Sequence, residues 1–302
     1  MKSEVAFFHK QLGDVLLMQP SLLKLAKYVG HPVALATKPA FEPMISLMEG
    51  TEYFPFQPFK QVKQVWVYET SSWSTLRAMS LRAERKNLFH RSDRNPSLLH
   101  RLCFSILPYE WARENYRAQY YWEITPGDGA FVPPKLSIPP EAWLPLGFSE
   151  KNYILIHPTA AWRRKTWLTE RWAETINRLA EHEMIVFTGG YSEWEKEYCE
   201  AILKDVKAPV LFLAGRTSLR QLLRLVYQAR LVLTIDGAVS HISGALGRPC
   251  VTLFGAGNHP QWYYQIEHSA LVSGALLSGD SKSDLSPIQV EHVLEQANRF
   301  LR

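Results

Sequence analysis

An acidic residue, Asp14, stands where an apolar segment near the start of the chain gives way to a helix-like pattern. The preceding Gly13 permits either a positive φ or a close backbone approach. As a cap, Asp14 would stabilise the helix by about 1 kcal/mol. As a general base it would face a cleft between domains and take a proton from a substrate hydroxyl. The residues alone leave both interpretations open.

A second candidate is the loop "HPTAAWRRKTW", which follows an apolar run and precedes a predicted helix. It carries three consecutive cations, Arg163, Arg164 and Lys165. Cations supply charge and hydrogen-bond donors to phosphate, and the dipole of a following helix adds to the attraction. The pattern favours a phosphate-binding loop, with a surface loop of incidental charge as the alternative.

Two further segments combine glycines with polar residues. In "TGGYSE" the glycine pair that begins at Gly189 lets a ligand approach the backbone. Glu193, at the end of this segment, could accept hydrogen bonds from a ribose diol. The segment is not a complete G-x-G-x-x-G fingerprint. The second segment, "FGAGNH", is equally well explained as a plain turn.

The stretch "LTIDGAVSHISGALG" places Asp236 at the end of a predicted strand. The small residues Gly237 and Ala238 follow at a helix start, where a diphosphate can lie against free backbone N–H groups. His241 falls on the first turns of that helix. A lone histidine in such a place is more often structural than functional.

The elements that must position these residues alternate between strand and helix, which predicts parallel sheets covered on both faces. Ligands of such sheets bind beyond the carboxyl ends of the strands, where the candidate segments fall. Strands are predicted at residues 5–9, 31–37, 62–68, 153–157, 184–188, 210–213, 231–235 and 250–254. Helices are predicted at residues 14–29 (kinked or restarted at Pro20), 42–48, 170–181, 193–203, 218–228, 239–247 and 287–301.

Two stretches interrupt the alternation. Residues 76–121 carry six arginines and a lysine between positions 77 and 101, and we expect helices and loops over the first domain with one basic face. That face is either simply solvated or a docking surface for an anionic partner. Residues 125–145, rich in proline and glycine, are predicted to be the linker.

Composition narrows the class of protein. The net charge of +5 over 302 residues favours anionic partners, although no nucleic-acid-binding module is visible. The three cysteines, Cys103, Cys199 and Cys250, have neither metal-ligand nor disulfide-framework spacing. No apolar run approaches the roughly 18 residues of a membrane span. A soluble cytoplasmic protein, at most peripheral to a membrane, is expected.

Taken in order, the motifs resemble glycosyltransferase family 9, the bacterial heptosyltransferases that use ADP-heptose in lipopolysaccharide core synthesis. The resemblance covers the second half almost continuously and about the first 70 residues. The matching segments are "GDVLLMQPSL", "KTWL", "GGYSEWEK", "LAGRTSL", "DGAVSHISGALG" and "FG".

This resemblance implies an α/β protein of GT-B architecture, with two Rossmann-like doubly wound domains facing a central cleft. Residues 1–148 would bind the acceptor and residues 149–302 the nucleotide-sugar, with the last helix packing on either domain. The reaction implied is an inverting heptosyl transfer without a bound metal or cofactor. The partners implied are ADP-heptose and an anionic glycolipid, the lipopolysaccharide inner core, at the inner face of the cytoplasmic membrane of a Gram-negative bacterium.

Residue roles follow from the same resemblance. Asp14, beside Gly13, would be the base, and Lys165, with nearby arginines, would meet the charge of the leaving diphosphate. Thr159 would contact phosphate, and Glu193 the ribose. The donor sugar or diphosphate would be contacted by Asp236 and His241, with Gly237 and Ala238 beside them.

Two departures leave the donor sugar open. Asp236 is followed by Gly-Ala where the family usually has Thr-Gly, and Leu168 replaces the usual proline after K-x-W. A same-family transferase with another nucleotide-sugar or glycan acceptor, or a non-catalytic nucleotide-sugar-binding relative, therefore remain as alternatives. The joint presence of Asp14, Lys165 and His241 argues against the non-catalytic one.

Overall fold

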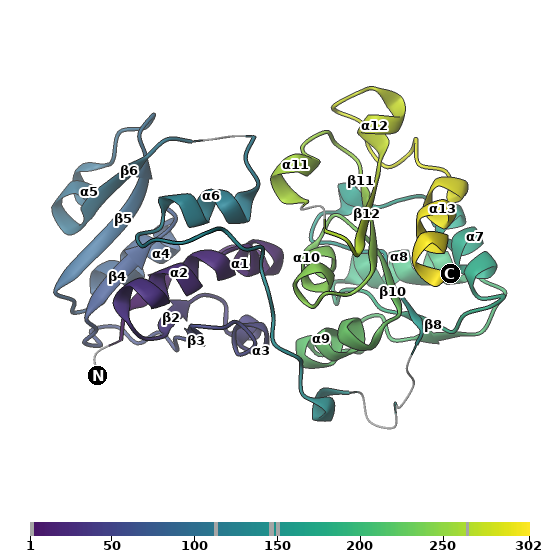
Figure 1. Cartoon of the computed structure of the whole chain (residues 1–302), viewed down its shortest axis with the longest axis horizontal. Helices are drawn as coiled ribbons and strands as arrows, with labels where there is room; N and C mark the ends of the chain where they lie inside the picture. Colours follow the sequence, from purple (N-terminus) through teal and green to yellow (C-terminus); the bar gives the residue numbers. More distant parts are fainter. Residues whose placement is uncertain (1–2, 112–113, 145–147, 149–151, 264–265) are drawn as a thin grey trace. The chain divides into compact units, whose positions relative to one another are not determined.

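The computed structural model describes residues 3–111, 114–144, 148, 152–263 and 266–302. The chain divides into two compact units, Met1–Ser137 and Ile138–Arg302. The division falls within the predicted linker, earlier than the boundary expected after residue 148. Apart from a single 3₁₀ turn at Glu141–Trp143, the described residues from 125 to 144 contain no helix or strand. Each unit is a parallel sheet with helices on its faces (Figure 1).

The first unit is built on six parallel strands in the order β3-β2-β1-β4-β5-β6. Their bounds are β1 Val5–Phe7, β2 Val33–Ala36, β3 Thr51–Tyr53, β4 Gln64–Val67, β5 Arg85–Arg91 and β6 Ser105–Tyr109. The central strands β1, β2 and β4 are almost wholly apolar because both faces of a parallel sheet are covered.

Helices connect these strands. Their bounds are α1 Leu12–Leu17, α2 Gln19–Val29, a 3₁₀ turn at Pro39–Phe41, α3 Glu42–Ile45, α4 Ser72–Ser80, α5 Leu98–Cys103 and α6 Arg117–Ile124. The predicted helix 14–29 is two helices: Pro20 lies in the first turn of α2, where its missing N–H costs nothing. α2 ends at Gly30, whose φ of +81° suits glycine.

The prediction for residues 76–121 was only partly right. The stretch contains the end of α4, the whole of α5 and the start of α6, but it also supplies β5 and β6, which extend the sheet to its edge. The middle of β5, from Asn87 to His90, is buried, and only its ends carry arginines. The basic residues of the stretch are therefore spread over two helices, a strand and loops rather than one helical face. β3 was not predicted either.

The second unit repeats the architecture with strand order β12-β11-β10-β7-β8-β9. The strands are β7 Ile154–His157, β8 Ile185–Phe187, β9 Val210–Phe212, β10 Leu231–Ile235, β11 Cys250–Phe254 and β12 Ser269–Ser273. The first five were predicted, whereas β12 was not.

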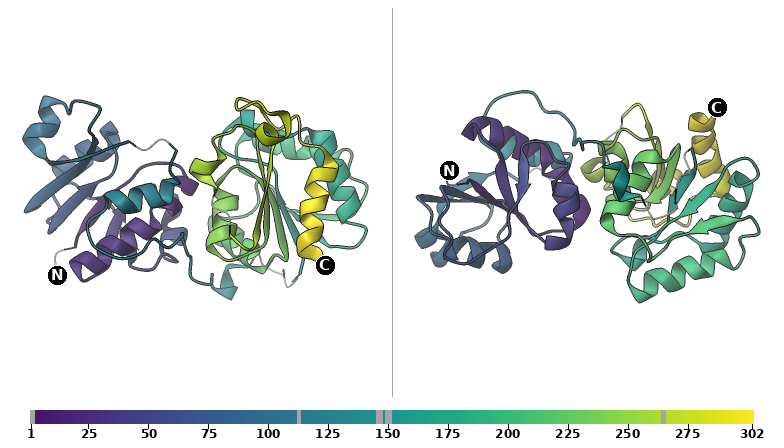
Figure 2. Two further views of the ribbon diagram at one scale, coloured as in Figure 1. Left: turned by 45° about the horizontal axis from the view of Figure 1, so that its top comes forward. Right: turned by 90° about the horizontal axis from the view of Figure 1, so that it is seen from below.

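The longer helices of this unit lie on the two faces of the sheet (Figures 1 and 2). The helices of the unit are α7 Thr169–Leu179, α8 Glu193–Leu203, α9 Leu219–Gln228, α10 Ala238–Ala245, α11 His259–Trp262, α12 Gly274–Ser278 and α13 Val290–Leu301, with a 3₁₀ turn at Arg163–Lys165. α7, α8 and α13 pack on one face of the sheet, where Trp172, Ile202 and Val293 join one apolar core. The last helix therefore belongs to the second unit, which decides between the two predicted positions.

Each sheet has one topological switch point, where the chain order reverses between neighbouring strands. It lies between β1 and β4 in the first unit and between β7 and β10 in the second. Open parallel sheets bind ligands beyond the carboxyl ends of the strands at such points. The segments that follow these four strands are therefore the candidate ligand-binding segments of each unit. None of the helices in the described residues combines the length and apolar composition needed to cross a bilayer.

Candidate functional site

The switch point of the second unit brings together Lys165, from the loop after β7, and Asp236, directly after β10. The Lys165 Nζ lies 2.5 Å from Oδ2 of Asp236 and 3.3 Å from its backbone carbonyl oxygen. The two side chains are 32% and 14% exposed, so the pair is partly shielded but open to a ligand. Residues 71 positions apart thus form one charged pair at the predicted place.

His241 on α10 is the third member of this group. Burial lowers its pKa to about 4, the Asp236 carboxylate opposes that shift, and the Lys165 ammonium reinforces it. The imidazole is therefore neutral at neutral pH, with one nitrogen to donate a hydrogen bond and one to accept. Lys165, predicted from one motif, shares one electrostatic environment with Asp236 and His241, which were predicted from another.

The loop carrying Lys165 is held at both ends. At its start, the buried Thr159 hydroxyl accepts a hydrogen bond from the backbone N–H of Gly190, at 3.0 Å. At its end, Trp167 is buried, and its Nε1 donates to the carbonyl of Ile288 at 3.0 Å. Between these anchors Arg163 and Arg164 are exposed in the 3₁₀ turn. The two anchors therefore hold the loop in place, and its cations lie between them.

The two glycines after β8 are required by close packing against other residues of the chain. A Cβ at Gly189 would lie 2.6 Å from Sγ of Cys199, and one at Gly190 would overlap the carboxylate of Glu195. Glu195 occupies that space because its carboxylate accepts hydrogen bonds from the hydroxyl and N–H of Ser192. Glu193 is the exposed first residue of α8.

Gly237 and Ala238 form the entry to α10. Gly237 is extended, and a Cβ there would lie 3.0 Å from Cβ of Ala160, in the loop after β7. A threonine at 237 would therefore require Ala160 to move. Ala238 opens the helix, and the Ser240 hydroxyl donates to the Gly237 carbonyl at 2.8 Å. The small residues let this helix start approach the Lys165 loop.

The glycines of "FGAGNH" pack against the chain's own backbone. A Cβ at Gly255 would lie 3.0 Å from Cα of Asp284, and one at Gly257 would lie 3.2 Å from Cα of Ser281. These close approaches explain both glycines by packing within the second unit. They favour the plain-turn interpretation of this segment.

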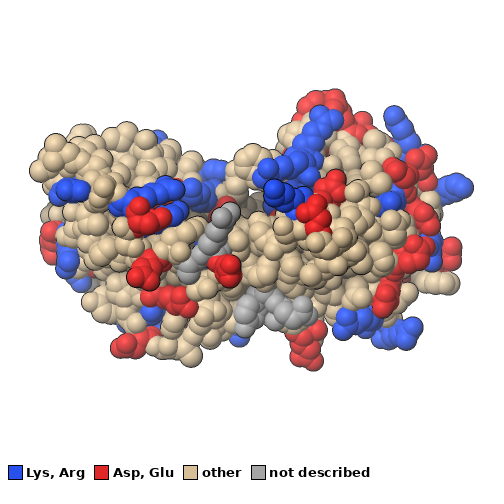
Figure 3. Space-filling model, turned by 90° about the horizontal axis from the view of Figure 1, so that it is seen from above, with Lys and Arg blue, Asp and Glu red and all other residues tan. Residues whose placement is uncertain are grey.

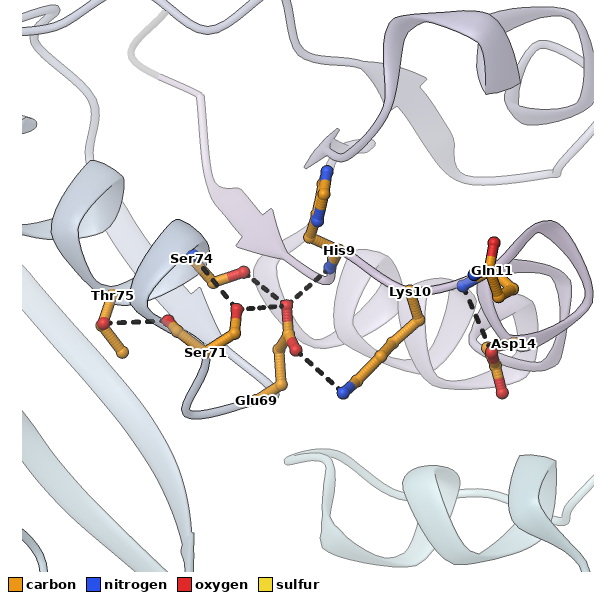
Figure 4. A network of polar contacts seen from close by, with 8 residues as sticks. All are labelled: His9, Lys10, Gln11, Asp14, Glu69, Ser71, Ser74 and Thr75. Atoms are coloured by element: carbon orange, nitrogen blue, oxygen red, sulfur yellow. Dashed lines mark hydrogen bonds and ion pairs between the residues drawn. The ribbon is translucent and has the colours of Figure 1, made fainter.

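At the switch point of the first unit, Asp14 lies in the first turn of α1. Its Oδ2 accepts a hydrogen bond from the backbone N–H of Gln11 at 3.2 Å, so it helps to cap the helix from the third helical position (Figure 4). Its charge also reaches Tyr121, where burial raises the pKa of the phenol and Asp14 raises it further. Gly13 is buried within the helix and its φ is not positive, which excludes the first of its two possible uses.

Sequence reasoning missed Glu69, the centre of the network in Figure 4. This carboxylate is buried beyond the end of β4, next to β1. Its Oε1 accepts hydrogen bonds from the His9 N–H at 2.8 Å, the Ser71 hydroxyl at 3.0 Å and the Ser74 hydroxyl at 2.6 Å. Its Oε2 pairs with the Lys10 ammonium at 3.3 Å. Glu69 thus ties the start of α4 to the segment that leads into Asp14.

An aromatic and cationic stack adjoins this network. The His9 ring stacks on Trp73 with a centroid distance of 3.9 Å, and the Arg77 guanidinium lies 4.3 Å from the Trp73 ring centre. Burial lowers the pKa of His9; Lys38 and Arg77 lower it further, while Glu69 opposes them. No spacing in the sequence signalled this stack, because its members come from different strand exits.

The twelve predicted site residues thus fall into two groups. Gly13 and Asp14 belong to the first unit, and the other ten belong to the second. Among the described residues, no group of three or more His, Cys, Asp or Glu is placed to hold a metal ion.

Comparison with known proteins identifies the family. Residues 128–282 match the family described as glycosyltransferase family 9 (heptosyltransferase). A curated relative, lipopolysaccharide heptosyltransferase 3 of Escherichia coli, is 30% identical over 135 residues, which is 42% of this chain and 40% of the relative. The chain matches between 31% and 43% of the length of the curated relatives found.

Solved structures share the whole fold. A family 9 glycosyltransferase from Veillonella parvula superposes with a TM-score of 0.81 at 17% identity, covering 99% of this chain and 97% of that one. E. coli heptosyltransferase WaaC, solved with ADP, gives 0.76 at 16% identity, with 99% of both chains covered. The two six-stranded parallel sheets thus form the GT-B fold of these enzymes. Because the family match spans half of the sequence, the chain belongs to glycosyltransferase family 9 (heptosyltransferase).

Proposed function

We propose that this enzyme transfers a heptose from ADP-heptose to the phosphorylated inner core of lipopolysaccharide, with inversion at the anomeric carbon. The observation that carries the proposal is the Lys165–Asp236 pair beside His241 at the switch point of the second sheet. A cation, a carboxylate and a neutral imidazole there suit a sugar diphosphate, which offers phosphate oxygens and hydroxyls together.

The second unit is proposed to bind the nucleotide-sugar. Lys165, Arg163 and Arg164 would meet the charge that develops on the leaving ADP, so the transfer would need no metal ion. The start of α10 adds backbone N–H groups at Gly237 and Ala238. Support for ADP comes from WaaC, which was solved with that nucleotide.

The first unit is proposed to bind the acceptor and to supply the base. Asp14 would accept the proton of the acceptor hydroxyl as its oxygen bonds to the anomeric carbon and the bond from that carbon to ADP breaks. A single displacement of this kind inverts the anomeric configuration. A lipopolysaccharide acceptor is supported by the named function of the curated relative.

The donor is tested by calorimetric titration of the full chain with ADP, UDP and GDP. We expect ADP to bind most tightly. If UDP bound as well or better, the enzyme would use another nucleotide-sugar, which is the alternative that the Gly237–Ala238 departure favours.

The acceptor is tested by mass spectrometry of the lipopolysaccharide core from a strain that lacks the gene. Loss of one heptose is the expected result. Loss of a different sugar would move the enzyme to another step, and an unchanged core would contradict the proposal.

A further inference from the structure

The short helix α5 exposes three leucines on the first unit. Leu98 is 73% exposed, Leu99 47% and Leu102 75%. Leu98 and Leu102 are four residues apart and therefore share one face of the helix. Exposed apolar side chains are common singly, whereas three within five residues form a patch that water solvates poorly.

The opposite side of α5 packs against the first unit. Cys103 is partly buried against the apolar core of the first unit, and the adjoining Phe104 is buried within it. The His100 ring makes an edge contact with Phe104, at a centroid distance of 6.3 Å. These contacts fix the helix on the sheet and leave its leucines facing outward, so the patch does not arise from a loosely attached segment.

The surroundings of the leucines are basic. Residues 91–104 contain three arginines and one acidic residue. That residue, Asp93, is paired with Arg91, and its side chain accepts from Nε of Arg91 at 2.9 Å. Arg94 and Arg101 are exposed. The patch therefore carries net positive charge. On the face drawn in Figure 3, the first unit, at left, carries Lys and Arg side chains, some with Asp or Glu beside them, among broad uncharged areas.

An aromatic side chain follows the neighbouring edge strand. The N–H of Ser92 donates to the carbonyl of Tyr109 at 2.8 Å, which joins the loop before α5 to the end of the edge strand β6. Trp111 follows two residues later and is partly exposed, and the Arg91 guanidinium lies 4.7 Å from its ring centre. Tryptophan beside arginine is typical of surfaces that contact a membrane interface.

We propose that the α5 surface, defined as Arg94, Leu98, Leu99, Arg101 and Leu102, docks on an anionic phospholipid bilayer. The leucines would enter the boundary between headgroups and acyl chains while the arginines pair with lipid phosphates. Charge selects lipid over a second copy of the chain, because a symmetric dimer through this face would set its arginines near one another. The inference is independent of the donor and of the catalytic base, and it goes beyond the proposed transfer.

The test is co-sedimentation of the full chain with vesicles of phosphatidylethanolamine containing about a third phosphatidylglycerol, compared with phosphatidylcholine vesicles. We expect binding to the anionic vesicles only, weakening as salt is raised. The double substitution Leu98→Ser/Leu102→Ser should lower the partition coefficient by about 10–100-fold, through loss of apolar insertion. Arg94→Gln/Arg101→Gln should lower it by roughly 10-fold or more.

A matched control lies on the second unit. Leu276 and Leu277 of α12 are 68% and 45% exposed, and Leu276→Ser/Leu277→Ser should bind vesicles like the wild type. ADP titration and melting temperature show whether each variant is folded, and the arginine pair probes the surface without touching the leucines. Binding that survives both α5 pairs would overturn the proposal. A dimer that the leucine pair converts to monomer would instead make this surface a self-interface.

Discussion

The Lys165 ammonium and the Asp236 carboxylate lie 2.5 Å apart, one after β7 and the other after β10, at the switch point of the second sheet. Each side chain neutralises the other, so a diphosphate that engages Lys165 must share it with Asp236 or displace the carboxylate. The two partners should consequently affect nucleotide affinity in opposite directions.

Lys165→Ala should weaken ADP binding by roughly 10–100-fold, since it removes a charge-assisted contact and leaves the Asp236 carboxylate facing the phosphates. Isothermal titration of the full chain measures the change. Lys204 is an exposed lysine at the end of α8. Lys204→Ala is the matched control and should bind ADP like the wild type. Equal affinities of the two variants would remove Lys165 from the nucleotide site.

Asp236→Asn should have the reverse effect on the nucleotide. The amide keeps the size of the side chain but releases Lys165 and removes a negative charge, so ADP affinity should rise by about several-fold. Heptosyl transfer should nevertheless fall if Asp236 orients the donor sugar. Weaker ADP binding in this variant would show that Asp236 holds the nucleotide by another route.

The fold of the second unit was largely predictable because its strands are short apolar runs and its helices have clear starts. α8, for example, begins at Glu193, directly after the Ser192 cap, and ends at Leu203, as predicted. β5 and β6 were missed because charges flank the buried middle of β5, while β6 contains Pro108, which only an edge strand accommodates readily.

The site was predictable where one residue follows one strand, as Asp236 follows β10. Glu69 could not be predicted in the same way. Its partners come from the backbone of His9, 60 residues away, and from two serines at the next helix start. No local spacing encodes a contact that depends on β1 and β4 being neighbours.

Stability should depend on the buried His157 at the end of β7. Burial lowers its pKa to about 4, so the folded chain binds this proton less readily than the unfolded chain. The resulting stabilisation is present above about pH 6.5, declines as the pH falls and is lost near pH 4, and amounts to roughly 3 kcal/mol. His157→Asn, which can keep a donor toward Thr188, should flatten the pH dependence of the unfolding free energy measured in urea. The control is His182→Asn, at an exposed site, which should not flatten the pH dependence of the unfolding free energy in this way.

Glu69→Ala should destabilise the first unit by roughly 2–4 kcal/mol, because a buried donor left without an acceptor costs about 1–3 kcal/mol. It should also reduce turnover by loosening the segment before Asp14. Glu69→Gln retains an acceptor for the His9 N–H and should lose less of both. Glu52→Gln, at an exposed position of β3, is the control for charge alone. Thermal melts and kcat measure the two effects, and ADP affinity should stay unchanged in all three variants.

Asp14→Asn separates capping from catalysis. Asparagine retains a side-chain oxygen that can accept from the Gln11 N–H, so α1 and the melting temperature should be little changed. A neutral amide cannot take up the proton of the acceptor hydroxyl, and turnover should therefore fall by roughly 10²–10⁴, the usual contribution of a general base. ADP titration should match the wild type, because the nucleotide contacts are proposed to lie in the second unit. The discriminating measurement is kcat at saturating donor and acceptor. Wild-type turnover in this variant would leave Asp14 with its helix-capping role alone and would place the base elsewhere.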